Sequence, residues 1–464
     1  MTARVVEAFE ATARRRPHRV ALRWEGRALT YERLDRLAGG FARFLHHHGV
    51  RAGDRVALAI GNRWTFPVAL LGAMKLGATV APLDARLTAE ERAAILRDLE
   101  PAAVAHEVVG DEAEWPSQPV ETPALILYTS GSTGAPKGAL LSQRAVAFGV
   151  GSWIDPVMAL TADDVVLAVL PLSHSYGLNG ALLAPLVAGA QVVLVERFSP
   201  EAVTAAVREH GVTVFPGVAT MFRRLLEAGR DLEALRRLRL AVAGAAPCPW
   251  PLVTEWRERT GVRILRGYGM TEVFRPISYG ACEEDDRPDS VGRPVPGVEF
   301  RVVDDEGRPL SPGSAGELLI RSPAVMDGYL GAPDETRAVL REGWFRTGDL
   351  ASVDAEGHVR IEGRKRERIL RGGYSVFPPE VEAVLAAHPA VAEAAVVGVP
   401  DDDLGEEVVA YVVPRDGARV DVEALLAWCR ARLAAFKCPR EVRLVPALPR
   451  SATGKVLKSA LGGR

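Results

Sequence analysis

The sequence predicts an α/β protein: a large N-terminal domain of two doubly wound α/β subdomains and a small distorted β-barrel, followed by a small α+β domain. Three observations predict this class. Strand and helix patterns alternate over the first two-thirds of the chain, hairpin patterns replace them near Arg293, and a separate mixture of helices and strands follows a basic run at 364–368. The chain has 464 residues, more than one compact core usually holds, so several domains are expected.

The alternating region combines short apolar runs with longer helical patterns. Strands are expected at 55–60, 79–83, 165–170, 191–195, 212–215, 238–242 and 262–265. Helices are expected at 65–76, after Gly177, and at 200–210, 220–228 and 251–260. Strands separated by helices of this length form parallel βαβ units, so this region predicts doubly wound sheets.

Two hairpin patterns follow the alternating region. Residues 299–303 and 316–321 are strand patterns joined through a turn at 304–307, and a second hairpin at 350–361 has its turn at 354–357. Short turns that contain Asp and Gly between apolar runs favour antiparallel hairpins. A small barrel or a distorted sheet is therefore expected in this part of the chain.

The C-terminal part has its own alternation of elements. Helices are expected at 379–387 and 422–434, and strands at 394–399, 408–413 and 441–445. This pattern predicts a compact α+β unit after the basic run. The predicted domains are therefore residues 1–365 and 366–464.

Composition and charge exclude several classes of protein. Hydrophobic residues make up 48% and charged residues 25%, ordinary values for a soluble globular protein, and the formal net charge is −2. This charge balance argues against nucleic acid or an anionic membrane as the main partner. No apolar run reaches the ~20 residues of a membrane span, and the N-terminus lacks the apolar core of a signal peptide. A cytoplasmic protein is expected.

Cysteine and histidine patterns do not predict a metal site. The 4 cysteines are not closely paired, which argues against a zinc site or a disulfide scaffold. The histidines at 46–48 end a predicted amphipathic helix, and the helix dipole favours histidine at that position. Metal binding by these histidines is therefore set aside.

The strongest local signal is the segment 125–138, in which an apolar strand runs into a turn rich in Ser, Thr and Gly. Such a turn can direct several backbone N–H groups and hydroxyls at one phosphate, and its glycines allow close approach. Lys137 adds a positive charge. A flexible linker rarely follows a buried strand in this way. A P-loop NTPase is rejected because that motif needs Gly before the Lys and Ser or Thr after it, whereas Pro136 and Gly138 flank Lys137.

Three further segments carry groups suited to a nucleotide. Residues 267–272 offer an aromatic ring, glycines for close approach, a hydroxyl and a carboxylate. Asp349 ends an aromatic stretch, where a carboxylate can accept both hydroxyls of a ribose, and Lys455 lies in a glycine-bearing loop near the C-terminus. Each alone has a plainer explanation: a turn around Tyr268, a hairpin cap at Asp349 and a solvated lysine at Lys455.

Together, these motifs resemble the signatures of the adenylate-forming superfamily, in the family's order and over nearly the whole chain. That superfamily includes acyl-CoA synthetases, luciferases and the adenylation domains of peptide synthetases. The resemblance implies that a carboxylic acid, ATP and magnesium form an acyl-adenylate, whose acyl group then passes to the thiol of coenzyme A. It also implies that the C-terminal domain is a mobile lid that rotates between the two steps.

The resemblance assigns a role to each matching residue. The β- and γ-phosphates of ATP would lie against Thr129, Ser130, Gly131, Ser132, Thr133, Gly134 and Lys137. The adenine and the α-phosphate would contact Gly244, Ala245, Ala246, Pro247, Tyr268, Gly269, Met270 and Thr271. Glu272 would hold magnesium, and Asp349 and Arg364 would hold the ribose. Lys455 would bridge the carboxylate and the α-phosphate, Arg366 would be the hinge, and Gly372, Gly373 and Tyr374 would line the pantetheine tunnel.

The acyl pocket is expected around His174, because segment 171–177 resembles the start of the family's carboxylate site. The rest of the wall would be Tyr176, Val218, Ala245, Met270, Phe274 and Arg275. An inward-pointing Arg275 could pair with a second acidic group of the substrate. A surface arginine, or one paired with the acidic stretch 283–286, is the favoured alternative.

An acyl-CoA synthetase is the leading interpretation. The alternative is an adenylating ligase that loads the phosphopantetheine arm of an acyl carrier protein, and a chain without a fused carrier domain favours free coenzyme A. A nucleotide-binding scaffold without catalysis is disfavoured because Thr271, Glu272, Asp349, Arg364 and Lys455 are all present. The identity of the acid and the oligomeric state, monomer or homodimer, stay open.

Overall fold

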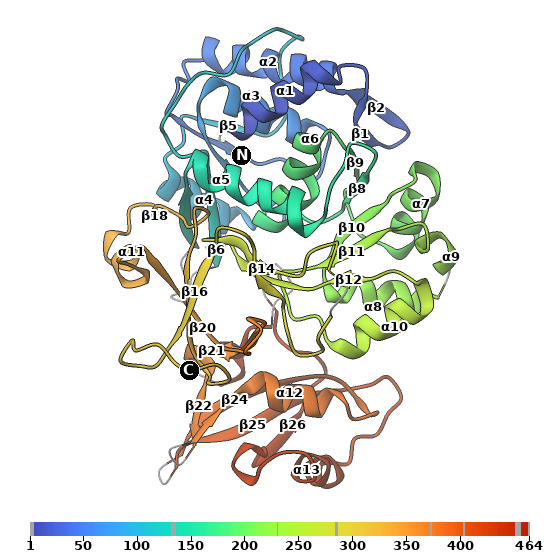
Figure 1. Ribbon diagram of the computed structural model, residues 1–464, viewed down its shortest axis with the longest axis vertical. Coiled ribbons are helices and arrows are strands. Elements are labelled where there is room, and N and C mark those ends of the chain that lie inside the picture. Colours follow the sequence, from blue (N-terminus) through green and yellow to red (C-terminus); the bar gives the residue numbers. More distant parts are fainter. Residues whose placement is uncertain are drawn as a thin grey trace. The chain divides into compact units, whose positions relative to one another are not determined.

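The computed structural model describes residues 4–130, 136–229, 231–283, 286–371, 374–401, 404–450 and 456–462 (Figure 1). The chain divides into two compact units. The first comprises Met1–Phe300 and Ile320–Phe345, and the second comprises Arg301–Leu319 and Arg346–Arg464. Part of the hairpin region therefore groups with the C-terminal segment. The predicted start of a separate lid domain at residue 366 stays a prediction.

The first unit contains a seven-stranded sheet with the order β12-β11-β10-β8-β9-β1-β2. Its central strands are parallel, since Val166 on β8 pairs in parallel with Val192 on β9 and with Val214 on β10. The strands are β1 (Val20–Trp24), β2 (Arg27–Thr30), β8 (Val165–Ala168), β9 (Gln191–Leu194), β10 (Val214–Gly217), β11 (Leu240–Ala243) and β12 (Ile264–Leu265). The parallel strands alternate with helices as the sequence predicts.

Three helices pack against one face of this sheet: α7 (Pro200–His210), α8 (Ala219–Ala228) and α10 (Trp250–Thr260). Phe222 of α8 and Trp256 of α10 are fully buried in the shared core. Local sequence sets the ends of α7. The Ser199 hydroxyl caps its first turn, and Gly211 ends it with a φ of 65°, a left-handed conformation that glycine adopts without strain.

A six-stranded sheet with the order β18-β7-β6-β4-β3-β5 completes the α/β part of the first unit. Its strands are β3 (Arg55–Leu58), β4 (Thr79–Pro82), β5 (Ala103–Ala105), β6 (Leu125–Ser130), β7 (Pro136–Leu141) and β18 (Gly328–Tyr329). β3 to β6 are parallel, whereas β7 returns antiparallel to β6 and is followed by β18 at the edge. Ile95 and Leu99 of α4 (Ala89–Leu99) pack against this sheet.

A three-stranded antiparallel sheet also lies in the first unit, formed by β13 (Gly267–Met270), β14 (Phe274–Ser278) and β15 (Arg293–Pro294). The remaining α-helices of this unit are α1 (Val5–Arg15), α2 (Tyr31–His47), α3 (Thr65–Leu76), α5 (Gln143–Ser152), α6 (Ala184–Ala188), α9 (Leu232–Leu235) and α11 (Pro333–Val339). Within the described part of the chain, two segments are π-helical, η1 (Trp153–Val157) and η2 (Gly177–Leu183). The helix predicted after Gly177 is thus η2 continued by α6.

The hairpin strands form where the sequence predicts them, with an additional two-residue strand at 340–341. They are β16 (Glu299–Val303), β17 (Gly316–Arg321), β19 (Leu340–Arg341), β20 (Trp344–Val353) and β21 (Val359–Arg364). β20 and β21 are antiparallel, and Asp349 pairs in register with Arg364. This register places the two predicted ribose-binding residues, Asp349 and Arg364, directly opposite each other on neighbouring strands.

The C-terminal sheet of the second unit has the order β23-β22-β25-β24, with β26 paired to β25. Its strands are β22 (Ile369–Arg371), β23 (Tyr374–Val376), β24 (Val391–Asp401), β25 (Gly405–Pro414) and β26 (Glu441–Leu444), and its helices are α12 (Pro378–Ala386) and α13 (Val422–Arg430). Helix α13 ends four residues before the predicted position 434, and a 3-10 turn, η4 (Ala435–Lys437), follows. The predicted α/β fold class is confirmed.

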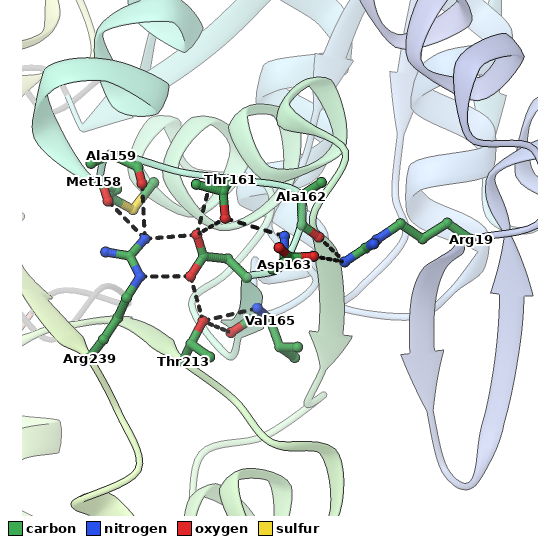
Figure 2. A network of polar contacts seen from close by, with 10 residues as sticks. Arg19, Met158, Ala159, Thr161, Ala162, Asp163, Val165, Thr213 and Arg239 are labelled. Carbon is green, nitrogen blue, oxygen red and sulfur yellow. Dashed lines mark hydrogen bonds and ion pairs between the residues drawn. The ribbon is translucent and has the colours of Figure 1, made fainter.

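Asp164, directly before β8, lies at the centre of a polar network whose partners Arg239, Thr161 and Thr213 are labelled in Figure 2. The Asp164 carboxylate accepts hydrogen bonds from Arg239 Nε at 2.7 Å, Arg239 Nη2 at 2.8 Å and Thr213 Oγ1 at 2.8 Å. Thr213 comes directly before β10 and Arg239 directly before β11. The network therefore ties together the amino ends of three parallel strands that are neighbours in the sheet order. Among the residues described, no helix is long and apolar enough to cross a membrane.

Candidate functional site

The predicted phosphate segment is a β-hairpin formed by β6 and β7. The two strands pair in antiparallel register, with Thr129 opposite Lys137 and the backbone of Ser130 opposite Pro136. Four of the predicted phosphate contacts, Gly131, Ser132, Thr133 and Gly134, lie outside the described residues. In the described part of the hairpin, Lys137 is the second residue of β7.

Lys137 points its charge toward the edge strand β18. Its Nζ lies 2.9 Å from Glu335 Oε2 and 5.5 Å from the ring centroid of Tyr329. Tyr329 is held there because β18 pairs antiparallel with β7, with Tyr329 opposite Ala139. The lysine ammonium thus lies over an aromatic face, a geometry that attracts a cation.

The same tyrosine contacts the second predicted motif. The Tyr329 hydroxyl donates a hydrogen bond of 2.9 Å to Glu272 Oε1, and the Glu272 carbonyl accepts one of 2.8 Å from the backbone N–H of Met326. Burial first, and then the neighbouring Glu272 carboxylate, raise the pKa of Tyr329, so the phenol is a hydrogen-bond donor at neutral pH. Lys137 and Glu272, 135 positions apart in the sequence, therefore meet on one side chain.

Glu272 lies in the turn 271–273 between β13 and β14, two strands whose close pairing needs glycine at one position. In this segment β13 pairs with β14, and Tyr268 lies opposite Ile277. A Cβ atom at Gly269 would lie 2.0 Å from the Phe274 carbonyl oxygen, so a side chain at this position would collide with backbone. Phe274 itself has a φ of 56°, an uncommon conformation for a residue other than glycine. Met270 is still paired with Phe274, so Thr271 and Glu272 lie in the turn that joins β13 to β14.

The magnesium expected from the sequence fits this arrangement as an ion that arrives with the nucleotide. The part of the chain that the structure describes contains no cluster of three or more His, Cys, Asp or Glu side chains suited to a metal. Magnesium in phosphate-binding sites commonly takes one or two carboxylates and completes its shell with phosphate oxygens and water. Glu272, which accepts a hydrogen bond from Tyr329, is the carboxylate that the sequence predicts for this ion.

The predicted acyl-pocket residue Tyr176 lies at the carboxyl ends of β10 and β11. Its hydroxyl lies 2.7 Å from the carbonyl oxygen of Val242 and 3.3 Å from that of Gly217, positions suited to donation to either. Its ring stacks on Trp153, with centroids 5.3 Å apart and an interplanar angle of 11°. Burial raises the pKa of Tyr176. In open α/β sheets, ligands bind outside these strand ends, which is where the predicted segments at 218 and 244–247 also begin.

Arg275 is buried, with 6% of its surface exposed. Its Nη1 donates to the Ala243 carbonyl at 2.9 Å and its Nε donates to Ser278 Oγ at 2.9 Å. The favoured sequence interpretation of Arg275, a surface arginine or a partner of residues 283–286, is therefore wrong. The described carboxylates of that stretch pair with other arginines, Glu283 with Arg293 and Asp286 with Arg263 and Arg266.

His174 contacts a carboxylate that the sequence analysis did not identify. Its Nε2 lies 3.0 Å from Asp84 Oδ2, which also pairs with Arg86 at 2.7 Å. Burial alone would raise the pKa of Asp84, but the hydrogen bonds from His174 and Arg86 outweigh it and hold this pKa well below its usual range. One imidazole nitrogen is therefore committed to Asp84, and the predicted substrate-side role of His174 stays a prediction.

The predicted ribose residues meet in the second unit. Arg364 Nε lies 2.8 Å from Asp349 Oδ1, and the Asp349 carboxylate is buried. Predicted hinge residue Arg366 lies in the 3-10 turn η3 (Lys365–Glu367). Tyr374, predicted for the pantetheine tunnel, is 60% exposed and stacks on Phe436 at 4.7 Å. Gly372, Gly373 and Lys455 lie outside the described residues.

Sequence reasoning missed Tyr329, Glu335, Trp153 and Asp84. Tyr329 belongs to a strand of two residues whose partner, β7, lies far earlier in the chain. Such a short strand carries no periodic pattern, and its pairing is invisible to local analysis. Trp153 lies in a π-helical segment, which apolar periodicity also does not predict.

Comparison with known proteins matches nearly the whole chain. The family model for AMP-binding enzyme matches residues 9–120 and 105–330, and the model for AMP-binding enzyme C-terminal domain matches residues 380–455. A feruloyl-CoA synthase from an Amycolatopsis species is 36% identical over 482 aligned residues, covering 97% of this chain and 97% of the relative.

Solved structures agree with this match. ATP-bound MatB from Rhodopseudomonas palustris superposes with a TM-score of 0.92 at 32% identity, over 98% of each chain. An o-succinylbenzoate coenzyme A synthetase from Bacillus subtilis, in complex with ATP and a magnesium ion, superposes with a TM-score of 0.88 at 31% identity, again over 98% of each chain.

Proposed function

The chain belongs to the AMP-binding enzyme family, and we propose, from that premise, how its residues carry out ATP-dependent ligation of a carboxylic acid to coenzyme A. The protein is an AMP-forming acid–CoA ligase that uses ATP, magnesium and coenzyme A. In the first step the acid carboxylate attacks the α-phosphorus of ATP, and pyrophosphate leaves. In the second step the thiolate of coenzyme A attacks the acyl carbon of the adenylate, and AMP leaves.

One observation supports the proposed site most strongly: Tyr329 joins Lys137 of the phosphate hairpin to Glu272 of the second motif. Two anions, a carboxylate and a triphosphate, must approach each other in the first step, so the site must gather positive charge and N–H donors. Lys137 supplies a cation beside the predicted phosphate turn. Bound magnesium, held by Glu272, would neutralise further phosphate charge.

The remaining site residues are proposed to hold the ribose, the adenine and the reacting groups. Asp349 is buried and held by Arg364, so its carboxylate is fixed in orientation for the two hydroxyls of a ribose. Thr271 would donate to the α-phosphate, and residues 244–247 and Tyr268 would enclose the adenine. Lys455 would bridge the attacking carboxylate and the α-phosphate. Aligning both reactants could lower the barrier by ~7–11 kcal/mol relative to free reactants.

Two details of the reaction go beyond the family match: which acid is activated, and whether a carrier protein can replace coenzyme A. Coenzyme A is the acceptor, and the alternative acceptor, the phosphopantetheine arm of an acyl carrier protein, is to be compared with it directly. In that comparison the same acid and enzyme are supplied with either thiol. If the carrier protein outcompetes coenzyme A, the acyl group is transferred to the carrier protein in the second step.

Exchange of labelled pyrophosphate into ATP, without coenzyme A, tests the proposed site. We expect exchange that requires both a carboxylic acid and magnesium. Glu272→Gln should lower its rate by ~10²–10³, because it removes the charge of the magnesium ligand. Glu306→Gln, an exposed glutamate in the hairpin region, is the control and should exchange normally. Exchange without acid, or equal exchange in both variants, would refute the assignment.

A further inference from the structure

The buried guanidinium of Arg275 has no role in the proposed nucleotide chemistry, and its charge is not balanced by a neighbouring carboxylate that the structure describes. Its Nη2 atom is closed to solvent and has no hydrogen-bond partner in the described part of the chain. No Asp or Glu among the residues described forms an ion pair with it, and its neighbours are neutral: Ala243 O, Ser278 Oγ and the ring of Trp153, 4.9 Å from Cζ. A buried cation without a counter-charge is costly, so a partner from outside the chain would be strongly favoured.

The guanidinium remains a cation under ordinary conditions. Burial lowers the pKa of Arg275 to about 10, which lies well above neutral pH. Cation–π contact with Trp153 offsets part of the cost of burial. It does not satisfy the two N–H bonds of Nη2, each of which needs an acceptor oxygen.

The position of the guanidinium places it in the wall of the predicted acyl pocket. A Cβ atom at Gly267 would lie 2.3 to 2.5 Å from Nη2, Cζ and Nε of Arg275. A Cβ atom at Gly244 would lie 3.2 Å from Nη1 and 2.9 Å from the Tyr176 ring. The guanidinium therefore lies directly on the main chain of Gly267, beside Tyr176, and occupies volume that these two glycines leave open.

We propose that Arg275 makes this ligase select short acids that carry a second anionic group, such as a dicarboxylate, with the guanidinium as the receptor for that group. The inference rests on the proposed acid–CoA ligase function. A planar guanidinium can bind a carboxylate through two parallel N–H···O bonds. The unpaired N–H bonds of Nη2 are the donors left for such a carboxylate, while Nη1 and Nε stay bonded to Ala243 and Ser278 and hold the guanidinium in place. The same bulk excludes long apolar chains.

Matched pairs of acids test the proposal by acid-dependent pyrophosphate release. Succinate is compared with butanoate, and glutarate with pentanoate, so that each pair differs in a distal carboxylate against a methyl group. We expect the wild-type enzyme to favour the diacid in kcat/KM by about 10–10²-fold, the range for hydrogen bonds to charged groups. Arg275→Met should abolish or invert the preference, and Arg275→Lys should keep part of it.

Two controls separate this proposal from failure of the proposed function. Arg97→Met, at an exposed arginine of α4, should leave the acid preference unchanged. Retained ATP-dependent stabilisation of Arg275→Met in thermal unfolding would show that the variant folds. If no acid releases pyrophosphate with the wild-type enzyme, the proposed function fails. If neutral acids are favoured by the wild type, or if Arg275→Met keeps the diacid preference, only the role of Arg275 is overturned.

Discussion

At the scale of single residues, Tyr329 joins two motifs of the proposed nucleotide site. One face of its ring attracts Lys137, and its hydroxyl donates a hydrogen bond to Glu272 Oε1. The sequence could predict Lys137 and Glu272, because both belong to motifs that local pattern reveals. It could not predict that a tyrosine near position 330 links them, because that link depends on the pairing of β18 with β7.

Removing the Tyr329 hydroxyl should change the response to magnesium. Tyr329→Phe keeps the ring beneath Lys137 but leaves the Glu272 carboxylate without its positioning hydrogen bond. Loss of a group that orients a metal ligand commonly weakens metal binding about 10–100-fold. We therefore expect the magnesium concentration for half-maximal pyrophosphate exchange to rise by about tenfold or more.

Tyr128→Phe is the matched control for this experiment. Tyr128 lies on β6 of the same hairpin, but its hydroxyl donates to Asp98 at 2.7 Å, away from Glu272. Its magnesium dependence should equal that of the wild type. An unchanged magnesium requirement in Tyr329→Phe, or the same shift in both variants, would mean that Tyr329 does not position the metal ligand.

Arg275 shows where residue-scale reasoning from sequence stops. Its place three positions after Glu272 indicated the acyl pocket, but a charged side chain in a loop is usually exposed, and that alternative was favoured. The structure buries it because Gly244 and Gly267 leave room beside Tyr176 and Trp153. Such room depends on which glycines meet in space, and no local pattern contains that information.

At the scale of elements, the carboxyl and amino ends of the parallel strands in the seven-stranded sheet carry different kinds of residues. The predicted functional segments at 218 and 244–247 follow the carboxyl ends of β10 and β11. The amino ends of β8, β10 and β11 carry the Asp164 network of Figure 2. Burial alone would raise the pKa of Asp164, but hydrogen bonds from Arg239, Thr161 and Thr213 hold it below its usual range.

Asp164→Asn should therefore destabilise the first unit in a pH-dependent way. The change removes the charge that Arg239 pairs with, and since Arg239 is partly exposed we expect a loss of about 1–2 kcal/mol in free energy of unfolding at neutral pH. A folded pKa below the unfolded value means that the stabilisation is complete above ~pH 4 and is lost as pH falls below it. Urea denaturation of wild type and variant from pH 8 to pH 3 measures this.

The neighbouring Asp163 provides the control for this prediction. Its side chain is 93% exposed and pairs with Arg19 at 3.2 Å, so Asp163→Asn should leave the denaturation midpoint unchanged. The network is not a stabilising element if Asp164→Asn unfolds at the same urea concentration as the wild type. A difference that grows below pH 4 would contradict the sign of the pKa shift.

Most elements could be predicted in order and type from their patterns, and the failures have physical reasons. Regular helices such as α7 carry both a capping serine and a terminal glycine, and the helix forms over the predicted residues. Strand β18 has two residues, and η1 and η2 are π-helical, so none of them has a periodicity to detect. Helix α13 ends at Arg430, and residues 431–434, predicted as its last turn, form a non-helical turn and bend ahead of the 3-10 turn η4.

At the scale of the whole molecule, the ligation divides into an adenylation step and a thiol step. The resemblance of the motifs predicted this reaction, and the family match over both parts of the chain supports it. The residues proposed to separate the steps, Lys455 for the first and Gly373 for the second, lie outside the described residues. Their roles are therefore accessible to kinetics and stay predictions here.

Two variants should each impair one step and spare the other. Lys455→Ala should slow adenylate formation by ~10²–10³ but spare thioester formation from a pre-made acyl-adenylate. Gly373→Leu should spare pyrophosphate exchange and block the thiol step, because a bulky side chain would fill the pantetheine tunnel. Equal losses in both half-reactions of Lys455→Ala, or normal overall turnover of Gly373→Leu, would count against these roles.

The product balance with ATP, magnesium, an acid and coenzyme A tests the central claim most directly. The account predicts one AMP, one pyrophosphate and one acyl-CoA thioester for each acid consumed, with the acyl-adenylate accumulating when coenzyme A is omitted. Formation of ADP and phosphate, or AMP release without any thioester when coenzyme A is present, would contradict it.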